Sequence, residues 1–370
     1  MPVLDGHAMG GEPMVDAADF LVNQKDYADT RWVERPTASI ADGEVLLKVD
    51  AFALTANNVT YAAYASVARY WDFFPAEGGF GRVPVWGFAT VVASRCAGVD
   101  VGTKYYGYYA PSTDIVMQPV EVNERRFIDG AAHRRDLPPI YNEYVSTQAD
   151  PAYDPSYEGI QMLFRPLFAT GWLLDQTVAA QTPSPTQVVV TSASSKTAMT
   201  YAHLAGARSG VRVIGLTSES NRDFVERSGL YAEVLSYDAV NTLASDEAAV
   251  AIDFRGQGEL RQAIAARLGS SLSKFLRVGA TDWQSKSSQE VPLPQEEWFF
   301  APSVAQMCAQ QMGPAAFLKK MLADTRAFYS RAEGLVKVNE APARAGLTAA
   351  WSEALAGSIA PDDGRILRFT

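Results

Sequence analysis

The segment that decides the fold is QVVVTSASSKTAMTYAHLAGARSGVRVIGLT, residues 187–217. It opens with an apolar run at 187–193, continues with a helical pattern at 196–208 and ends in a second apolar run at 211–217. Two buried strands joined by a helix form a βαβ unit, and such units build parallel sheets. The same alternation predicts helices at 220–229 and 259–269 and strands at 232–238, 249–254 and 274–280. The sequence therefore predicts an α/β domain whose parallel sheet is covered by helices on both faces.

The chain before residue 110 has the texture of β structure instead. The segments 44–54, 83–93 and 101–109 are rich in β-forming residues and are separated by glycine-containing turns, which predicts a barrel-like β domain. Residues 111–160 carry six prolines and are expected to form an inserted or elaborated loop. Such a loop either covers a site or is a solvated elaboration.

Composition limits the class of protein. The 370 residues are 48% apolar and carry a formal net charge of −10, which favours a two-domain globular protein and argues against nucleic-acid or anionic-membrane partners. Two cysteines and three widely spaced histidines predict no metal site. The N-terminal residues lack the pattern of a signal peptide, and the uncharged stretch 298–318 contains glutamines and prolines that make a membrane span improbable. We expect a cytoplasmic protein.

The turn TSASSKTA, residues 191–198, joins the first parallel strand to its helix. A helix start presents unpaired N–H groups and the positive end of the helix dipole, which favour a phosphate. The predicted contacts are the hydroxyls of Ser192, Ser194, Ser195 and Thr197 and the amine of Lys196. Dinucleotide loops commonly use glycines here, and this turn has none. The alternative is an ordinary helix with a capping serine and Lys196 in solvent.

The end of the second strand indicates which dinucleotide is bound. An Asp or Glu at this place usually meets a free ribose 2′-hydroxyl, whereas Thr217 and Ser218 stand here, with Asn221 and Arg222 one turn inside the helix. This favours NADP(H) over NAD(H), although Glu219 would repel a 2′-phosphate if it pointed inward. The alternative is a helix cap with Arg222 exposed. Tyr237 and Gly279, at the ends of the third and fifth strands, complete the predicted cofactor contacts.

Several segments together resemble one known superfamily. EVLLKVDAFALTANNVTYA (44–62), VPVWGFATVVASRCAGVDVGTKYYGY (83–108) and VVVTSASSKTAMTYAHLA (188–205) are similar, in order and spacing, to motifs of the medium-chain dehydrogenase/reductases. The chain resembles the zinc-free, quinone-oxidoreductase-like side of that superfamily, as a divergent bacterial branch. The resemblance implies a GroES-like β-barrel-type domain over 1–165 with an insertion around 111–139. It further implies a Rossmann doubly wound domain over 166–310 and a return to the first domain over 311–370.

The chain also departs from the superfamily's pattern. Zinc enzymes place His-Glu after the glycine matched by Gly87, and Phe88 and Ala89 stand there instead. The cysteine ligand expected near Thr55 is missing as well. We therefore expect no catalytic zinc. The glycines of the cofactor loop are replaced by Ser192, Ser195, Lys196 and Ala198, which makes cofactor binding a weaker expectation than the fold.

The resemblance also implies catalytic residues. Asn57 matches the asparagine beside the nicotinamide, where it would orient ligand or cofactor, and Tyr61 or Tyr64 on the following short helix would donate a proton. The alternative for both tyrosines is aromatic packing at a cleft. Aromatic residues at Phe52, Tyr70, Trp71, Phe73 and Phe74 suggest an apolar substrate site. Arg125, Arg126, Arg134 and Arg135 would receive an anionic substrate tail or form a solvated loop face.

Three functions remain in competition. The leading one is a zinc-independent, NADPH-dependent reductase of an activated C=C bond or quinone, with a small apolar or conjugated substrate and, by resemblance, a homodimer. The second is a non-catalytic descendant that binds a nucleotide or a partner. The third is an acyl-thioester or lyase activity in which Lys196 contacts a substrate phosphate.

Overall fold

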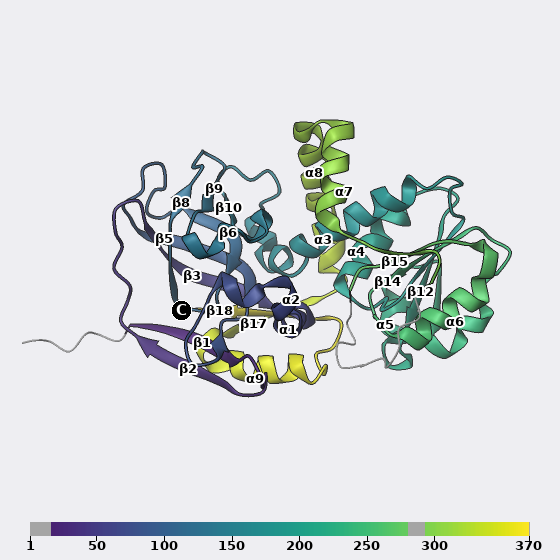
Figure 1. Ribbon diagram of the computed structural model, residues 1–370, viewed down its shortest axis with the longest axis horizontal. Helices are drawn as coiled ribbons and strands as arrows, with labels where there is room; N and C mark the ends of the chain where they lie inside the picture. Colours follow the sequence, from purple (N-terminus) through teal and green to yellow (C-terminus); the bar gives the residue numbers. More distant parts are fainter. Residues whose placement is uncertain (1–15, 280–292, 370) are drawn as a thin grey trace, which may run out of the picture. The chain divides into compact units, whose positions relative to one another are not determined.

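The computed structural model describes residues 16–279 and 293–369, and the chain divides into two compact units (Figure 1). The first unit holds the described residues up to Phe52, residues Ala65–Ala149 and Phe369. The second holds Ala53–Tyr64 and Asp150–Arg368. This division by packing does not coincide with the boundaries at 165 and 310, which stay predictions of domain organisation.

The first unit is built from antiparallel strands. One sheet has the order β3-β5-β6-β10-β9-β8, with β7 also paired to β3, and a second sheet has the order β2-β1-β4. The strands are β1 (Ala17–Asn23), β2 (Thr30–Arg35), β3 (Val45–Leu54), β4 (Phe80–Gly81), β5 (Val85–Ser94), β6 (Lys104–Tyr109), β7 (Asp114–Met117), β8 (Pro119–Val120), β9 (Arg126–Asp129) and β10 (Glu143–Ser146). The helix α2 (Ala65–Ala68) and a 3₁₀ turn, η1 (Tyr70–Phe73), also belong to it. The predicted strands at 44–54, 83–93 and 101–109 are confirmed as β3, β5 and β6.

The expectation that residues 111–160 form a loop is wrong. Four strands, β7 to β10, lie within it, and the chain enters α3 at Glu158. These strands have only two to four residues, as their bounds show, so no alternation long enough to be recognised is present in the sequence.

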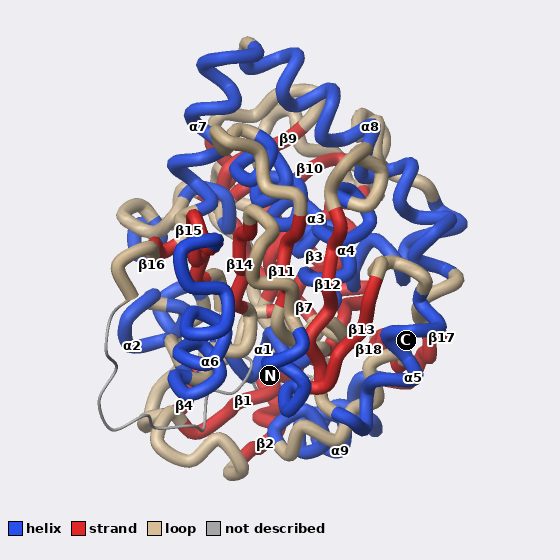
Figure 2. Tube along the Cα trace, turned by 90° about the vertical axis from the view of Figure 1, so that its right-hand side faces the viewer, coloured by secondary structure: helices blue, strands red, loops and turns tan. Residues whose placement is uncertain are grey.

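The second unit contains the predicted parallel sheet, in the order β13-β12-β11-β14-β15-β16 (Figure 2). Its strands are β11 (Gln187–Val190), β12 (Arg212–Thr217), β13 (Glu233–Ser236), β14 (Ala249–Asp253), β15 (Leu272–Arg277) and β16 (Glu296–Trp298). Connections from β11 lead through α4 (Lys196–Ala205) to β12 and through α5 (Glu219–Ser228) to β13. The connection from β14 leads through α6 (Gly258–Leu268) to β15 in the opposite direction. Right-handed crossovers therefore place α4 and α5 on one face and α6 on the other.

Burial explains why these elements assemble. Val189, Ile214, Ala251 and Phe275, from four neighbouring strands, form one apolar cluster with Ile264 of α6. Each of these five side chains is fully buried, so the face of the sheet beneath α6 is a continuous core.

The remaining elements of the second unit come from several separate parts of the chain. They are α1 (Ala56–Ala63), α3 (Glu158–Ala179), α7 (Ala301–Met312), α8 (Pro314–Glu333), β17 (Lys337–Pro342), α9 (Ala343–Leu355) and β18 (Asp363–Arg368). The strands β17 and β18 pair in parallel, and α1 lies against α9. No helix among the described residues is both long and apolar enough to cross a bilayer.

Candidate functional site

The parallel sheet changes its direction of winding between β11 and β14. The chain goes from β11 to β12 on one side, whereas β14 lies on the other side. Loops leaving the carboxyl ends of two such strands diverge and open a crevice, which is the usual ligand site of open α/β sheets. The turn after β11 and the turn after β14 are therefore the first places to examine.

The turn after β11 presents backbone donors. Ser192 has φ +48°, and the N–H of Ser195 donates to the Ser192 carbonyl at 2.8 Å, which closes a tight turn before α4. The Ser195 hydroxyl caps the helix by accepting from the Ala198 N–H at 3.3 Å. The N–H groups of Ser194, Lys196 and Thr197 make no hydrogen bond to any described residue. Unpaired donors at a helix N-terminus form a site for an anion such as a phosphate.

Two side chains from α5 and its following loop hold this turn. The Tyr231 hydroxyl donates to the Ala193 carbonyl at 2.7 Å, and the Asn221 side-chain amide donates to the Ser194 hydroxyl at 3.1 Å. The Ala193 N–H donates to the Leu216 carbonyl at 3.0 Å. Asn221, predicted to meet the ligand directly, therefore supports the turn. Tyr231 was not predicted from the sequence.

Lys196 lies partly buried beside the turn that precedes β18. Its Nζ is 3.5 Å from the Pro361 carbonyl oxygen, so the side chain does not extend into solvent as the capping alternative supposed. Burial lowers the pKa of Lys196 to about 8, although the nearby carboxylates of Asp363 and Asp362 act in the opposite direction. The amine is close to the anion-binding turn in sequence, but its hydrogen bond is made to another loop.

A polar network joins β11 to β14 across the crevice. The Thr191 hydroxyl donates to Asp253 Oδ1 at 2.6 Å and accepts from the N–H groups of Phe254 and Arg255 at 3.0 and 3.1 Å. Burial raises the pKa of Asp253, and its hydrogen bonds oppose that rise. The N–H of Gly279, a predicted cofactor contact, donates to the Asp253 carbonyl at 3.4 Å. The sequence signal for this network is the aspartate that ends the otherwise apolar strand AVAID, and the sequence analysis missed it.

The far end of the crevice lies beside the end of β12. Thr217 is 1% exposed, and its hydroxyl has no hydrogen-bond partner among the described residues. Ser218 and Ser220 hydrogen-bond to each other at 3.0 Å between their hydroxyl oxygens. Arg222 is held by Glu226, with Nε 2.9 Å from Oε1, and has Glu219 within 4.0 Å. The predicted guanidinium is thus engaged by two carboxylates.

A different arginine, Arg255, follows the carboxyl end of β14. The guanidinium of Arg255 lies 4.0 Å from the ring centroid of Tyr237, a predicted cofactor contact. Cation–π stacking of this kind places a positive charge and a flat aromatic face together. Arg255 was missed by the sequence analysis because the sequence does not show that a side chain after β14 reaches the residue after β13, with β12 and β11 between these strands in the sheet.

The predicted catalytic residues share one face of α1. Asn57, Tyr61 and Tyr64 are separated by four and three residues, the spacing of one helix stripe. The helix is begun by Thr55, whose N–H donates to Asn58 Oδ1 at 2.8 Å. Tyr61 is 6% exposed, whereas Tyr64 is 39% exposed. The structure places this stripe in the same compact unit as the parallel sheet.

The predicted aromatic wall is partly wrong. Phe52, Phe73 and Phe74 are buried in the core of the first unit, where Phe73 packs edge-on against Tyr108 with 5.5 Å between ring centroids. Only Tyr70 and Trp71 of the predicted set are half-buried. The sequence showed aromatic residues close together without showing which of them the core required.

The prediction that four arginines receive an anionic substrate tail or form a solvated face is wrong for Arg134. Arg134 is 1% exposed, with Nη1 3.1 Å from Asp129 Oδ2, and it donates to the Tyr144 hydroxyl at 2.7 Å. Arg126 pairs with Glu143 at 3.2 Å. Arg134 is therefore an internal structural residue, neither a solvated one nor a receptor for a ligand.

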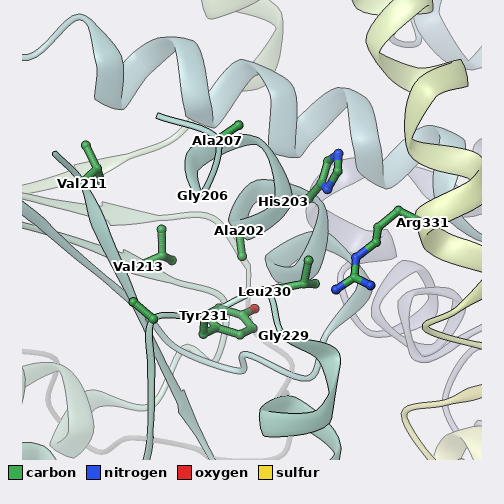
Figure 3. A pocket seen from close by; sticks show the side chains of 11 residues that line it. Ala202, His203, Gly206, Ala207, Val211, Val213, Gly229, Leu230, Tyr231 and Arg331 are labelled. Atoms are coloured by element: carbon green, nitrogen blue, oxygen red, sulfur yellow. The ribbon is translucent and has the colours of Figure 1, made fainter. Parts of the chain in front are cut away.

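A pocket of about 420 Å³ lies beside the beginning of β12 and the loop after α5 (Figure 3). It is lined by Ala202, His203, Gly206, Ala207, Val211, Val213, Gly229, Leu230, Tyr231, Ala232 and Arg331. Burial lowers the pKa of His203, and Arg331 acts in the same direction. Arg331 donates to the Ser228 carbonyl at the end of α5, so its charge already serves a helix C-terminus.

Within the part of the chain that the structure describes, no group of three or more His, Cys, Asp or Glu side chains is arranged to hold a metal ion. Phe88 and Ala89, the residues after Gly87, offer no ligand atom in their side chains.

The chain matches one described protein family over most of its length. Residues 52–360 match the family described as "Protein of unknown function (DUF2855)". No curated protein matches the sequence.

Solved structures share the fold along nearly the whole chain. CurA from Vibrio vulnificus in complex with NADPH aligns with a TM-score of 0.61 at 12% identity, over 95% of this chain and 99% of that chain. A mutant form of enoyl thioester reductase from Candida tropicalis aligns at 0.59 and 14% identity, over 96% and 100%. CurK enoyl reductase aligns at 0.57 and 15% identity, over 96% and 99%. These likenesses confirm the predicted fold, which comprises a GroES-like domain and a Rossmann domain.

Proposed function

The chain belongs to the DUF2855 family, and from its site we propose that it is an NADPH-dependent reductase of an activated C=C bond, such as that of an enone, an enoyl thioester or a quinone. One observation carries this proposal. The N–H groups of Ser194, Lys196 and Thr197 are unpaired within the described chain and stand at a helix N-terminus where the sheet reverses its winding. The structures of similar fold include one in complex with NADPH and two named as enoyl or enoyl thioester reductases, which supports the same reading.

The residues present fit a dinucleotide at the diphosphate. A phosphate accepts hydrogen bonds and carries charge, and the turn after β11 offers N–H donors with the positive end of the α4 dipole. The buried Thr217 hydroxyl, which lacks a partner among the described residues, would bond to the adenosine ribose. Arg255 and Tyr237 would flank the adenine and supply a positive charge near the 2′-phosphate. When bound, NADPH supplies the hydride.

The stripe on α1 would act on the substrate. Reduction of a conjugated C=C bond needs a proton at the carbon that does not receive the hydride, or stabilisation of the enolate oxygen. A tyrosine hydroxyl from Tyr61 or Tyr64 would supply this, with Asn57 orienting the ligand. The greater exposure of Tyr64 favours it as the residue that a substrate can reach. We propose that no metal takes part, because the residues after Gly87 have no ligating side-chain atoms.

Two substitutions at one position test the anion-binding turn. Lys196 is the first residue of α4, and Ser195 before it is extended, so a proline at 196 fits the helix start. Lys196→Met removes the amine alone, whereas Lys196→Pro removes the amine and one N–H donor. We expect fluorescence titration to show NADPH binding by the wild type and a further loss of about tenfold in affinity from the methionine to the proline variant.

The matched control is Glu219→Pro, at the first position of α5. Ser218 before it is also extended, so the proline should be accommodated equally well. This variant should bind NADPH at least as tightly as the wild type, because it removes a carboxylate. Absence of NADPH binding by the folded wild type would refute the proposed function.

A second function is favoured by one observation. Lys196 is hydrogen-bonded to the Pro361 carbonyl, and Arg222 forms an ion pair with Glu226. The two positive side chains that were predicted to contact the cofactor thus already have partners within the chain. A protein that binds a nucleotide without transferring hydride would agree with this. A screen of enones, enoyl thioesters and quinones distinguishes the two functions. The oxidation of NADPH is followed by the loss of its absorbance, and only a reductase consumes the coenzyme.

We also propose a homodimer formed at the edge of the parallel sheet. Among the described strands β16 is the last in the order, and Trp298 and Phe300 beside it are 62% and 64% exposed. The following helix α7 has no charged residue. Exposed apolar residues beside a strand edge favour self-association. Light scattering after size exclusion should give a dimer for the wild type and a smaller mass for Trp298→Glu, and a monomeric wild type would contradict the proposal.

A further inference from the structure

Tyr231 connects three parts of the second unit at one point. It stands in the loop between α5 and β13, and its hydroxyl donates to the Ala193 carbonyl in the turn after β11. Tyr231 is also one of the residues that line the pocket beside β12 (Figure 3). Burial raises the pKa of the Tyr231 hydroxyl well above its usual value, so it stays protonated and acts as a donor.

Gly215 in β12 makes room for this arrangement. A Cβ atom at position 215 would lie 2.9 Å from the Ala193 Cβ and 2.9 Å from the Tyr231 Cδ1 atom. Carbon atoms in proteins do not approach so closely, so any larger residue would push the tyrosine or the turn away. The turn itself contains no glycine, but Gly215 in the neighbouring strand β12 leaves the space that the turn and Tyr231 occupy.

The hydrogen bond to Ala193 has a consequence for the next residue. The Ala193 carbonyl and the Ser194 N–H belong to one planar trans peptide group and point in opposite directions. A carbonyl held against Tyr231 therefore directs the Ser194 N–H away from Tyr231. That N–H is one of the unpaired donors of the turn.

Such a restraint is needed here because the turn has no glycine. Ser192 adopts φ +48°, a conformation that residues other than glycine disfavour, so the turn is held under strain. If the 193–194 peptide rotated, an acceptor would replace a donor at the place where an anion binds. A site that binds phosphate through its backbone cannot tolerate that exchange.

We propose that Tyr231 is a positioning residue for the diphosphate, which it serves by holding the 193–194 peptide in the donor orientation. The inference rests on the proposed function and adds the residue by which a glycine-free turn keeps its donors aligned. It concerns the diphosphate alone, because the adenosine end of the crevice is formed by other residues.

The experiment compares Tyr231→Phe with Tyr201→Phe. The first variant keeps the ring and loses the bond to Ala193. The second removes a hydroxyl that is buried in α4 and has no hydrogen-bond partner among the described residues, which makes it a matched control. Calorimetric titration with NADPH, and separately with adenosine 2′-monophosphate, reports on the whole cofactor and on a ligand without a diphosphate.

We expect Tyr231→Phe to raise the Kd for NADPH about tenfold, while Tyr201→Phe leaves it within about twofold of the wild type. The Kd for adenosine 2′-monophosphate should change in neither variant. A general loosening of the unit would weaken both ligands in Tyr231→Phe, and that result would overturn the inference. Equal NADPH affinity in Tyr231→Phe and the wild type would also overturn it and leave the proposed function standing. A wild type that does not bind NADPH would overturn both.

Discussion

The Lys196 amine has neighbours of two kinds, a main-chain carbonyl and two carboxylates. Its amine is close to a main-chain carbonyl at Pro361 and has the carboxylates of Asp362 and Asp363 nearby. Burial lowers its pKa to about 8 from an ordinary value of 10.5. The residue is therefore partly deprotonated just above neutral pH.

The pH dependence of stability follows from this pKa. Between about 8 and 10.5 the unfolded chain binds more protons at this lysine than the folded chain, so the group's contribution to the free energy of unfolding rises with pH in that window. Lys196→Met should remove this rise. Urea unfolding of both proteins at pH 7.5, 9 and 10 (trial values spanning the window) checks it, and a wild-type-minus-variant difference that stays flat would contradict the assignment.

A second prediction at the same scale concerns Arg134. Its guanidinium and the Asp129 carboxylate are both buried, and the Tyr144 hydroxyl completes the group. Removing one member of a buried ion pair leaves an unpaired charge, which costs about 3–5 kcal/mol. Arg134→Met should lower the free energy of unfolding by about that amount. The double variant Arg134→Met, Asp129→Asn should recover part of the loss, and no recovery would show that the pair is not the cause.

The close contact between α3 and α4 requires a glycine at position 171. A Cβ at Gly171 of α3 would lie 2.2 Å from the Thr200 hydroxyl oxygen and 2.9 Å from the Tyr201 nitrogen. Gly171→Ala should therefore force the helices apart and cost about 1–3 kcal/mol. Since α4 begins at the anion-binding turn, the same variant should weaken NADPH binding.

The control is another helical glycine. At Gly346 of α9 the nearest atom to an added Cβ is the Ala341 Cβ, at 3.4 Å. Alanine there should leave the free energy of unfolding within about 1 kcal/mol of the wild type, because helix propensity offsets the crowding. Thermal melting of both variants tests the contrast, and equal losses at the two positions would contradict it.

Elements with long, uniform patterns could be predicted from the sequence, and short ones could not. The apolar runs that became β11, β12 and β14 were recognised because each fills a buried strand. The two-residue strand β8 carries too few residues for any pattern. Within the candidate site, the turn after β11 was found because it is local, whereas Tyr231 and Asp253 act on it through contacts between segments far apart in the chain.

At the scale of the whole molecule, neither compact unit is a continuous stretch of chain. The path passes from one unit to the other at 52/53, 64/65, 149/150 and 368/369. The second unit therefore needs α1, which is separated from its other residues by the 65–149 segment. A fragment comprising Asp150–Arg368 would lack the helix that lies against α9.

This predicts a measurable defect in that fragment. Without α1, the helix α9 loses a neighbour, so the fragment should melt at a lower temperature than the full chain. It should also bind the dye ANS, which reports exposed apolar surface. A fragment that melts at the temperature of the full chain without binding dye would contradict the assignment of residues 53–64 to this unit.

The same connectivity bears on synthesis. A ribosome releases α1 (Ala56–Ala63) about 280 residues before α9 (Ala343–Leu355) begins to emerge. At the usual pace of about 5–20 residues per second, the nascent α1 waits for about 15 seconds or longer before its partner exists. During that interval the apolar residues of α1 are accessible to chaperones. Slowing translation between the codons for α1 and those for α9 should therefore make the yield of folded protein depend more strongly on chaperones.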